Sequence, residues 1–425
     1  MENNNKLLIN LLNLSEADIK DINSINQDGI VSVYITLNSD FTLCPRCNGK
    51  LKSKGYYDKK ITISNYAFNN IKVYMHVKRL VCVDCHHSVS DSKHIGPRNK
   101  TISYSLINQV MELLKNPSMT FVEASRITGI SPMSVERLFD RHCHIPKQPL
   151  PEVLCIDEVY TKNSSFNSKY SCIFYDFAKR QIIDVLPSRH KAYLHNYFQN
   201  YQGSNELDNV KYVCIDMYRP YKDIVQIYMK KAIICVDSFH VIKHLNDDLS
   251  NIRIRIMKKY DKNSIEYYLL KNFKYLLFKN NINLDNEAKY NKRLERYINL
   301  RQLLNLMLSI DQDLMNAYYI KQSYSLFNET ATYETAETQL NNIIDSIIKA
   351  NIPEYSEFLS ILKNWKGEII NSFIRYKGKR INNSIAESIN SRIQTVLYNS
   401  RGIRDTTRRR KRIMYAINKE GFTLR

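Results

Sequence analysis

The sequence predicts a multidomain α/β protein. Its main part is a mixed β-sheet with covering helices and a helical insertion, preceded by a small β module and a helical segment. Three observations predict this. Apolar strand patterns alternate with helical patterns after Val153, two cysteine pairs flank an alternating stretch at residues 71–82, and residues 241–376 read as helical.

We expect three segments within the 425 residues. Residues 1–98 form a zinc-binding module, and residues 99–145 form a helix-turn-helix domain. Residues 146–425 form the sheet-containing domain, with its helical insertion at about 245–380. The segment Ile145–Pro151 holds three prolines in seven residues, which is typical of a linker between the last two parts.

The chain is strongly basic, with a formal net charge of +20. Such an excess indicates an anionic partner, most commonly a nucleic acid. A basic protein without such a partner is the alternative. No run of about 18 apolar residues is present, so no membrane span is expected. Nine cysteines and a start without a secretory pattern favour a reducing, cytosolic setting.

The first segment begins with a short helical pattern, a helix-starting box at Ser15–Asp18 and a strand pattern at Ile30–Leu37. Two CxxC pairs follow, and each can place two thiolates on one tetrahedral ion. The alternating residues between the pairs can form a β-ribbon. We therefore expect a structural zinc site, the alternative being two unrelated turns, with the ligands Cys44, Cys47, Cys82 and Cys85.

Three helices are predicted within residues 101–142. The last two read as a helix-turn-helix, with a break at Gly129 and a second helix opened by Ser131 and Pro132. The expected apolar contacts are Val122, Ala124, Ile127, Ile130, Val135 and Leu138. Side chains expected to reach DNA from the second helix are Ser134, Arg137 and Arg141. An ordinary helical hairpin is the alternative.

Three apolar strand patterns stop at an aspartate in the sheet-containing segment: Asp157, Asp216 and Asp237. Asp is a good turn initiator, so each alone can mean only a turn. If the strands are parallel neighbours, however, their carboxylates emerge at one end of the sheet, where α/β proteins place their sites. Paired carboxylates repel unless a cation joins them, and Mg²⁺ prefers oxygen ligands.

A third acidic candidate lies far along the chain at Glu387. Ser384 and Glu387 fit a capping box, which is the alternative role of this glutamate. The helical phase places Ile385, Ile389, Ile393 and Val396 on one face and Glu387, Asn390, Ser391 and Gln394 on the other. A carboxylate on that polar face, packed beside a sheet end, can serve a metal.

Taken together and in this order, these motifs resemble the IS-L-three family of bacterial insertion-sequence transposases. The resemblance spans nearly the whole chain, through "CPRC…CVDC", "IDE", "IDMYRPY", "VDSFHVIKH", "SIAESINSRIQ" and "RGIRD". It implies a ribonuclease-H-like catalytic domain with a DDE triad formed by Asp157, Asp216 and Glu387. Asp237 and His240 fall in the family's D-x-F-H pattern and support that site, with Asp237 as a reserve ligand. Gln394 departs from the family, which has lysine at this position.

The resemblance implies metal-dependent cleavage and strand transfer of DNA, with Mg²⁺ or Mn²⁺ held by the triad. Expected partners are double-stranded DNA, as terminal inverted repeats and target, and further copies of the chain in a synaptic complex. The expected location is the bacterial cytoplasm, with the nucleoid. We expect the basic run Arg408–Arg412 and the arginines just before it to hold phosphates. These residues are Arg401, Arg404, Arg408, Arg409 and Arg410.

Two other functions fit the same motifs. The first is a non-catalytic, sequence-specific DNA-binding regulator derived from a transposase, in which the sheet is only a scaffold. The second is a structure-selective nuclease of the same fold that cleaves without strand transfer. The presence of all three acidic residues favours the transposase over the regulator, because a scaffold does not require them.

Overall fold

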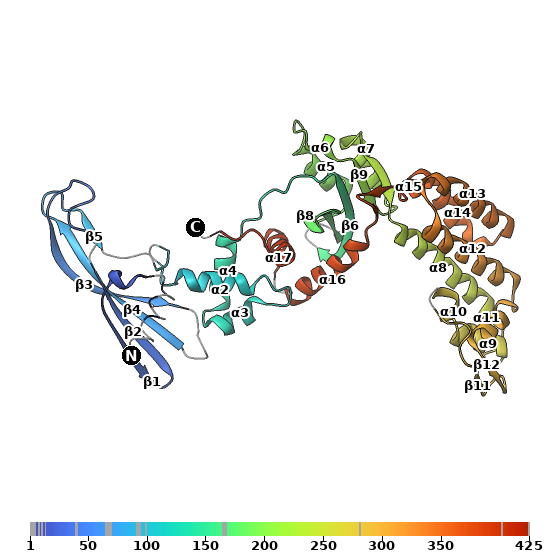
Figure 1. Cartoon of the computed structure of the whole chain (residues 1–425), viewed down its shortest axis with the longest axis horizontal. Helices are drawn as coiled ribbons and strands as arrows, with labels where there is room; N and C mark the ends of the chain where they lie inside the picture. The colour runs from blue at the N-terminus through green and yellow to red at the C-terminus, as the bar shows by residue number, and fades with distance from the viewer. Residues whose placement is uncertain are drawn as a thin grey trace. The chain divides into compact units, whose positions relative to one another are not determined.

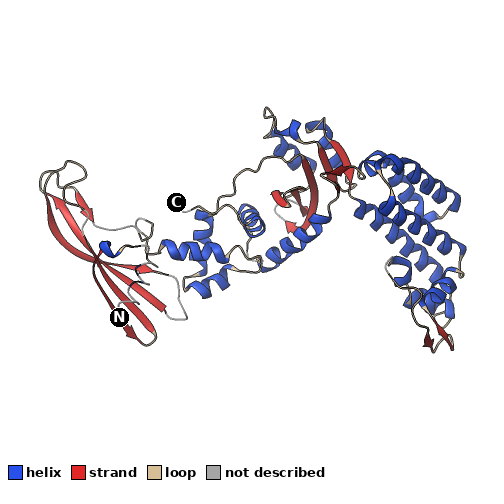
Figure 2. Cartoon of the chain, viewed as in Figure 1, coloured by secondary structure: helices blue, strands red, loops and turns tan. Residues whose placement is uncertain are grey.

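The computed structural model describes residues 6, 9, 12, 14–38, 41–63, 70–90, 95–97, 100–163, 168–279, 282–400 and 403–423, without the side chains of residues 70, 71, 162, 163, 384 and 385. These residues form two compact units. Unit 1 comprises residues 1–147 and 391–425, and unit 2 comprises residues 148–390. Mixed sheets and many helices agree with the predicted α/β class (Figure 2).

Unit 1 begins with a five-stranded sheet of order β1-β2-β4-β3, with β5 paired to β4 (Figure 1). The helix-starting box at Ser15 and Asp18 is present, but it opens only one 3₁₀ turn before the first strand. The stretch between the cysteine pairs forms the expected ribbon, because β3 and β4 pair antiparallel along most of their length. The strands are β1 Ile19–Gln27, β2 Ile30–Leu37, β3 Leu51–Thr62, β4 Asn70–Cys82 and β5 Ser88–Ser90.

Three helices follow, as the sequence predicts: α2 Tyr104–Leu113, α3 Phe121–Thr128 and α4 Pro132–His142. Gly129 ends α3 in the left-handed conformation at φ 71°, which glycine adopts without strain. Ser131 caps α4 by accepting a hydrogen bond from the Ser134 amide, and Pro132 occupies the first turn.

The predicted contacts of this helix pair are only partly correct. Ala124, Val135 and Leu138 are buried, whereas Val122 and Ile127 are exposed. The inward stripe of α3 runs through Phe121, Ala124 and Thr128, the i, i+3, i+7 spacing of one helix face. Val122 and Ile127 lie off that stripe and face solvent.

The C-terminal helix α17 (Thr406–Asn418) packs into the same helical cluster, and Figure 1 shows it beside α2–α4. The Tyr415 ring is buried among core residues of α2–α4, and its hydroxyl donates to the Met111 carbonyl. Residues 391–425, which the sequence patterns place in the sheet-containing segment, group with unit 1, and the buried face of α17 completes the core of these helices.

Unit 2 contains a second five-stranded sheet, of order β10-β9-β6-β7-β8. Strands β6, β9 and β10 are parallel, while β7 and β8 form the predicted antiparallel hairpin. The bounds are β6 Val153–Asn163, β7 Ser168–Asp176, β8 Gln181–Leu186, β9 Tyr212–Ile215 and β10 Ile233–Val236. Helices interleaved with them are α5 Lys191–Gln199, α6 Glu206–Asn209 and α7 Arg219–Tyr228.

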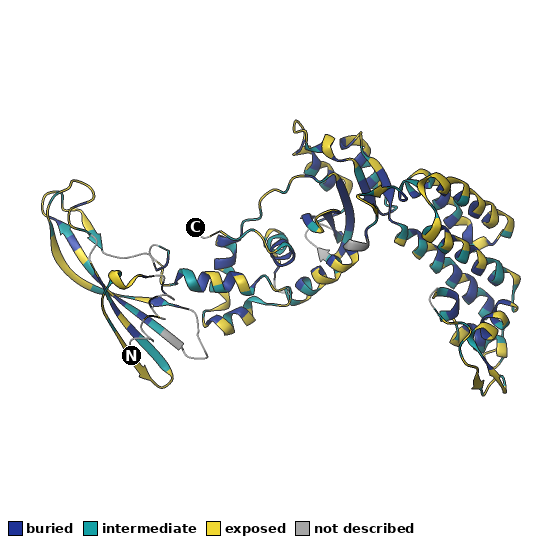
Figure 3. Ribbon diagram, in the orientation of Figure 1, coloured by how far each residue is buried: buried dark blue, intermediate teal, exposed yellow. Residues whose placement is uncertain are grey.

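Helices make up nearly all of the chain between the last sheet strand and α16 (Ser384–Asn399), apart from two short hairpins (Figure 2). Figure 3 shows the alternation of buried and exposed stripes along them. Trp365, the single tryptophan of the chain, is buried in their core. The elements are α8 Ser238–Met257, α9 Ile265–Asn272, α10 Tyr275–Phe278, β11 Lys289–Asn291, β12 Arg296–Ile298, α11 Leu300–Leu308, α12 Gln312–Thr330, α13 Tyr333–Ala350, α14 Ser356–Asn364, α15 Lys366–Asn371, β13 Arg375–Tyr376 and β14 Lys379–Arg380.

The buried Arg412 yields a stability prediction. Its side chain is 1% exposed and donates to the carbonyl oxygens of Leu114 (2.7 Å), Asn116 (3.0 Å) and Met119 (2.8 Å). Replacement by Met leaves these buried acceptors unsatisfied, at about 1–3 kcal/mol each. We expect Arg412→Met to lower the free energy of unfolding by about 3 kcal/mol or more in urea titrations. Exposed Arg404→Met is the control, and equal effects of the two would contradict the prediction.

Candidate functional site

The three aspartates lie in one row across the sheet of unit 2. Cys155 of β6 pairs with Cys214 of β9, which pairs with Cys235 of β10. Each aspartate follows its cysteine by two residues. The parallel register therefore places Asp157, Asp216 and Asp237 side by side, on the edge where β9 and β10 end.

One detail of the prediction was wrong. Asp216 and Asp237 directly follow the last residues of β9 and β10, but Asp157 does not close its strand. Strand β6 continues to Asn163, because its pairing with β7 extends beyond Asp157 after its pairing with β9 has stopped at Cys155. Asp157 therefore lies within a strand that is still paired with β7, whereas the other two aspartates follow the last residues of their strands.

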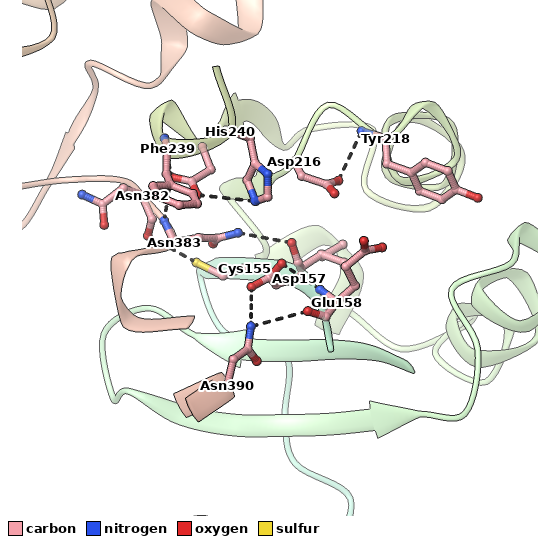
Figure 4. Close-up of polar contacts among 12 residues, drawn as sticks. Cys155, Asp157, Glu158, Asp216, Tyr218, Phe239, His240, Asn382, Asn383 and Asn390 are labelled. Atoms are coloured by element: carbon pink, nitrogen blue, oxygen red, sulfur yellow. Dashed lines mark hydrogen bonds and ion pairs between the residues drawn. The ribbon is translucent and has the colours of Figure 1, made fainter. Parts of the chain in front are cut away.

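Asp157 is fixed by two hydrogen bonds. Its Oδ1 accepts from the Glu158 amide at 2.7 Å, and its Oδ2 accepts from Asn390 Nδ2 at 2.9 Å (Figure 4). The Tyr175 hydroxyl donates in turn to Asn390 Oδ1 at 2.5 Å. The amide of Asn390 is thus oriented from one side and holds the carboxylate on the other. This chain links α16 directly to the sheet.

The charge of the neighbouring Glu158 affects Asp216. Its Oδ1 accepts from the Tyr218 amide at 3.2 Å. Glu158 ion-pairs with Arg189, whose guanidinium lies 4.8 Å and 4.6 Å from the ring centroids of Tyr170 and Tyr218. Burial, and next the charge of Glu158, raise the pKa of Asp216 to about 7.

Asp237 caps helix α8 and also accepts a hydrogen bond from the residue that precedes α16. Its Oδ1 accepts from the amides of Phe239 (3.5 Å) and Asn383 (3.3 Å). Asn383 Nδ2 donates to the carbonyl of Ile156, the residue before Asp157. His240 Nε2 lies 4.0 Å from Asp237 Oδ2. Asn383 therefore ties the start of α16 to two of the three aspartate positions.

Glu387 lies between these two attachments, four residues after Asn383 and three before Asn390. Residues at those spacings share one helix face, and the buried Ile389, Ile393 and Val396 lie on another, as predicted. The Glu387 side chain is exposed. The alternative capping role involves the side chain of Ser384, which is outside the described atoms.

The aspartate row suits a hard divalent cation by its chemistry. Asp157, Asp216 and Asp237 are 7%, 8% and 4% exposed, and burial raises the pKa of each. Buried carboxylates of like charge need a cation or a proton to stay together. Within the described part of the chain, however, only the four cysteines place three or more possible ligand atoms within 4.8 Å of one another. The acidic oxygens are near neighbours rather than a closed ligand set.

The four cysteines of unit 1 do form such a set. Cys44 and Cys85 Sγ are 3.7 Å apart, Cys47 and Cys82 are 3.4 Å apart, and Cys47 and Cys85 are 3.3 Å apart. All four sulfurs lie within 4.8 Å of one another. Tetrahedral thiolate ligation of zinc requires this arrangement, so the cluster fits a structural zinc ion with no open position.

The expected DNA-reading residues of α4 gather at one hollow of about 530 Å³ in unit 1. Arg137 and Arg141 are exposed there, beside Lys100. Ser134 is half-buried, and its hydroxyl hydrogen-bonds that of Ser131 at 2.9 Å. The hollow thus presents Arg137 and Arg141 of α4 and Lys100 from the segment before α2, together with the carboxylate of Asp140.

The basic residues near the C-terminus have different surroundings. Arg408 ion-pairs with Glu136 and Asp140, and Arg409 donates to the Ile403 carbonyl at 2.8 Å. Burial lowers the pKa of Arg409. Arg404 is exposed, Arg410 is half-buried, and Arg401 is outside the described residues. Arg412, at the end of the predicted basic run, is buried and satisfied by backbone carbonyls, so it is not available to phosphate.

Sequence reasoning missed several members of the site. Asn390 lies on the predicted polar face of its helix and Glu158 directly follows Asp157, but the sequence patterns assign a role to neither. Nothing local to Asn383, Tyr175 or Arg189 marks them, because their partners are distant in the chain. The signal that was present is the repeat "CID", "CID", "CVD", whose constant spacing sets the register of the row.

The raised pKa of Asp216 predicts a pH-dependent stability in cation-free buffer. Its ordinary pKa is about 3.9 and its folded pKa about 7, so between these values the folded state binds more protons and stability falls as pH rises. At about 1.4 kcal/mol per pKa unit, the loss is on the order of 4 kcal/mol. In urea titrations without added Mg²⁺, Asp216→Asn should gain stability over wild type as pH rises from 4 to 8.

The exposed Asp345 provides a matched control for this test, since Asp345→Asn should show no such trend. Added Mg²⁺ should restore stability to wild type at pH 8 and much less to Asp216→Asn. Parallel pH curves for wild type and Asp216→Asn would show that the carboxyl titrates normally.

Comparison with known proteins places the chain in a family. No curated protein matches it. Among the described helices, none is long and apolar enough to cross a membrane. A family model described as a transposase of the IS-L-three type matches residues 154–413, which include Asp157, Asp216 and Glu387. Because this match covers more than half of the 425 residues, the chain belongs to the IS-L-three family of transposases.

Proposed function

We propose that this protein is a DNA transposase that cuts and joins DNA at the terminal inverted repeats of an insertion sequence. Asp157, Asp216 and Glu387 are the proposed catalytic residues. The observation that carries the proposal is the row of buried aspartates, to which the Glu387-bearing helix is attached through Asn383 and Asn390. Family membership supports it.

The sheet topology supports a ribonuclease-H-like catalytic domain. Three parallel strands, β10, β9 and β6, continue into the antiparallel pair β7 and β8. The helical elements between β10 and α16 correspond to the insertion expected at about 245–380. In this architecture the candidate carboxylates come from the centre of the sheet and from the helix that follows the insertion.

The carboxylates of Asp157, Asp216 and Glu387 would hold Mg²⁺ or Mn²⁺. Such ions supply an activated water and stabilise the charge on the leaving 3′ oxygen. Asn390 keeps Asp157 oriented with one oxygen toward α16, and Arg189 neutralises Glu158 beside Asp216. Asp237 is engaged in two backbone hydrogen bonds, so we assign it to positioning α8 and Asn383.

Glu387 completes the set by rotation of its side chain. It is exposed, and no hydrogen bond or ion pair holds it among the described residues. Its backbone lies between Asn383 and Asn390, which both contact the aspartate row, so rotation about its side-chain torsions is the change that we propose. A cation that attracts three carboxylates provides the driving force, since it relieves their mutual repulsion.

DNA recognition is assigned to unit 1. The zinc-binding module and the helix-turn-helix formed by α3 and α4 would bind the inverted repeats, with Ser134, Arg137 and Arg141 toward the bases. Exposed Arg404, together with Arg401 and Arg410, would hold phosphates. Arg408 and Arg409 are used within unit 1 and hold α17 in place, so their contribution to DNA binding is secondary. Target DNA and further copies of the chain complete the synaptic complex.

The main alternative is a non-catalytic regulator that binds the same DNA. Three nearly buried carboxylates in register disfavour it, since burying them costs stability that a scaffold has no reason to bear. A nuclease without strand transfer is the other alternative, and strand joining in the cleavage assay separates it from a transposase.

The catalytic assignment predicts the behaviour of single variants. With a duplex carrying the terminal repeat and Mg²⁺, Asp157→Asn, Asp216→Asn and Glu387→Gln should each reduce cleavage and strand joining by about 1000-fold or more, the order of loss when a principal catalytic group is removed. Binding of the duplex without Mg²⁺ should stay unchanged. Asp345→Asn is the control, and cleavage that survives Asp157→Asn would place the active site elsewhere.

The recognition assignment predicts a contrast between two arginines. Arg137→Gln should weaken binding to the terminal repeat by about 5- to 150-fold, corresponding to about 1–3 kcal/mol for a base contact, and should affect unrelated duplex less. Arg404→Gln should weaken binding to both duplexes alike and reduce the slope of log K against log salt by about 1. Fluorescence anisotropy at several salt concentrations measures both. Equal losses on both duplexes for Arg137→Gln would remove it from base recognition.

A further inference from the structure

The sheet of unit 1 has two unlike faces. One face is an apolar core, in which Val33 and Ile35 of β2 and Val73, Met75 and Val77 of β4 are buried. Alternate residues of the same strands form the opposite face, which we call the outer face. It carries Tyr34 of β2, Lys72, Tyr74, His76 and Lys78 of β4, and Tyr56, Asp58 and Lys60 of β3.

The outer face presents two stacked ring pairs. Tyr34 and Tyr74 have centroids 5.0 Å apart and planes at 13°, while Tyr56 and His76 have centroids 4.7 Å apart and planes at 7°. Tyr34 and Tyr56, the members on the flanking strands β2 and β3, are 44% and 47% exposed. Each pair thus presents an accessible ring beside a partner that holds it in place.

Cationic side chains accompany the rings. Lys60 lies opposite Tyr74, and Lys78 lies opposite Tyr56, in the cross-strand register. On the outer face, strands β3 and β4 carry the cationic side chains Lys60, Lys72 and Lys78 against the single carboxylate of Asp58. Asp58 is itself paired with His76 at 2.6 Å. The strands that carry the rings therefore attract an anionic ligand.

Cross-strand ring stacking by itself can serve only to stabilise a sheet. That role does not require cations beside each pair or rings left nearly half exposed. A protein partner is also disfavoured, because protein interfaces are depleted in lysine at their centre. Planar rings interleaved with lysines match the two parts of a nucleic acid strand: unpaired bases stack on rings, and phosphates pair with cations.

We propose that the outer face of the β1-β2-β4-β3 sheet binds single-stranded DNA, with unpaired bases stacked on Tyr34 and Tyr56 and phosphates held by Lys60 and Lys78. This rests on the proposed function for the identity of the nucleic acid as DNA. It adds a second mode of contact to unit 1, separate from duplex recognition by α4. A strand opened beside the cleavage point is the class of ligand that such a surface would hold.

The test uses the full chain carrying Asp157→Asn in buffer without added Mg²⁺ or chelator, so that cleavage is suppressed and zinc is retained. The probe is a labelled oligothymidylate of about 20 nucleotides, longer than the roughly 4–16 nucleotides that one single-strand-binding fold covers. Replacing Tyr34 and Tyr56 together by Leu should weaken its binding by about 10-fold or more, since base stacking contributes strongly. Replacing both by Phe keeps the rings and should keep affinity within about twofold of the parent.

Two controls accompany these variants. Leu at the exposed tyrosines Tyr319 and Tyr333, which lie on helices of unit 2, should leave affinity unchanged. Binding of the terminal-repeat duplex should change little in the Tyr34→Leu, Tyr56→Leu protein. Zinc content and the urea unfolding midpoint report whether that protein keeps its fold.

Unchanged oligothymidylate affinity in a folded Leu variant overturns the proposal, and so does an equal loss of duplex binding. If the Leu variant loses zinc, the double variant Lys60→Gln, Lys78→Gln is the deciding test. For this variant, the slope of log K against log salt for oligothymidylate binding should fall by about 1–2. These outcomes are independent of catalysis. Cleavage that survives Asp157→Asn contradicts the proposed transposase site. Unchanged oligothymidylate affinity contradicts only the single-strand site.

Discussion

The structure of unit 2 depends on keeping three buried carboxylates together at one edge of a sheet. Parallel register places Asp157, Asp216 and Asp237 in a row, and burial raises the pKa of each. Their repulsion works against folding in the absence of a cation. The neighbouring groups reduce that cost only in part: a side-chain amide holds Asp157, backbone amides hold Asp216 and Asp237, and His240 lowers the pKa of all three.

Helix α16 connects this edge to the rest of the chain. Asn383 attaches its start to Asp237 and to the strand of Asp157, and Asn390 attaches its second turn to Asp157 itself. Because Glu387 lies between these two points, its backbone is anchored on both sides. Its side chain is exposed to solvent. The same helix then continues into unit 1, where α17 packs against the helices that carry the proposed DNA-reading residues.

Unit 1 gains its stability from two unlike sources. A cysteine cluster holds the ends of β3 and β4 near each other, and it suits a zinc ion whose ligation contributes directly to folding. The helical part instead depends on Tyr415 and Arg412, which insert from the far end of the sequence. Arg408, Arg409 and Arg412 are therefore structural, and the DNA contacts that we propose lie on α4, at Arg404 and its neighbours, and on the outer face of the sheet.

The sequence by itself determined the features that local patterns encode. Alternation predicted β2 and the β3–β4 ribbon, paired cysteine spacing predicted the metal-binding cluster, and Ser131 with Pro132 predicted the start of α4. Tertiary structure alone decided the rest. That β6 runs past Asp157, that Arg412 is buried, that Val122 and Ile127 face solvent, and that Asn383 and Asn390 hold the aspartates all depend on partners up to about 300 residues away. Local propensity carries no information on such contacts, because they exist only once distant segments have packed together.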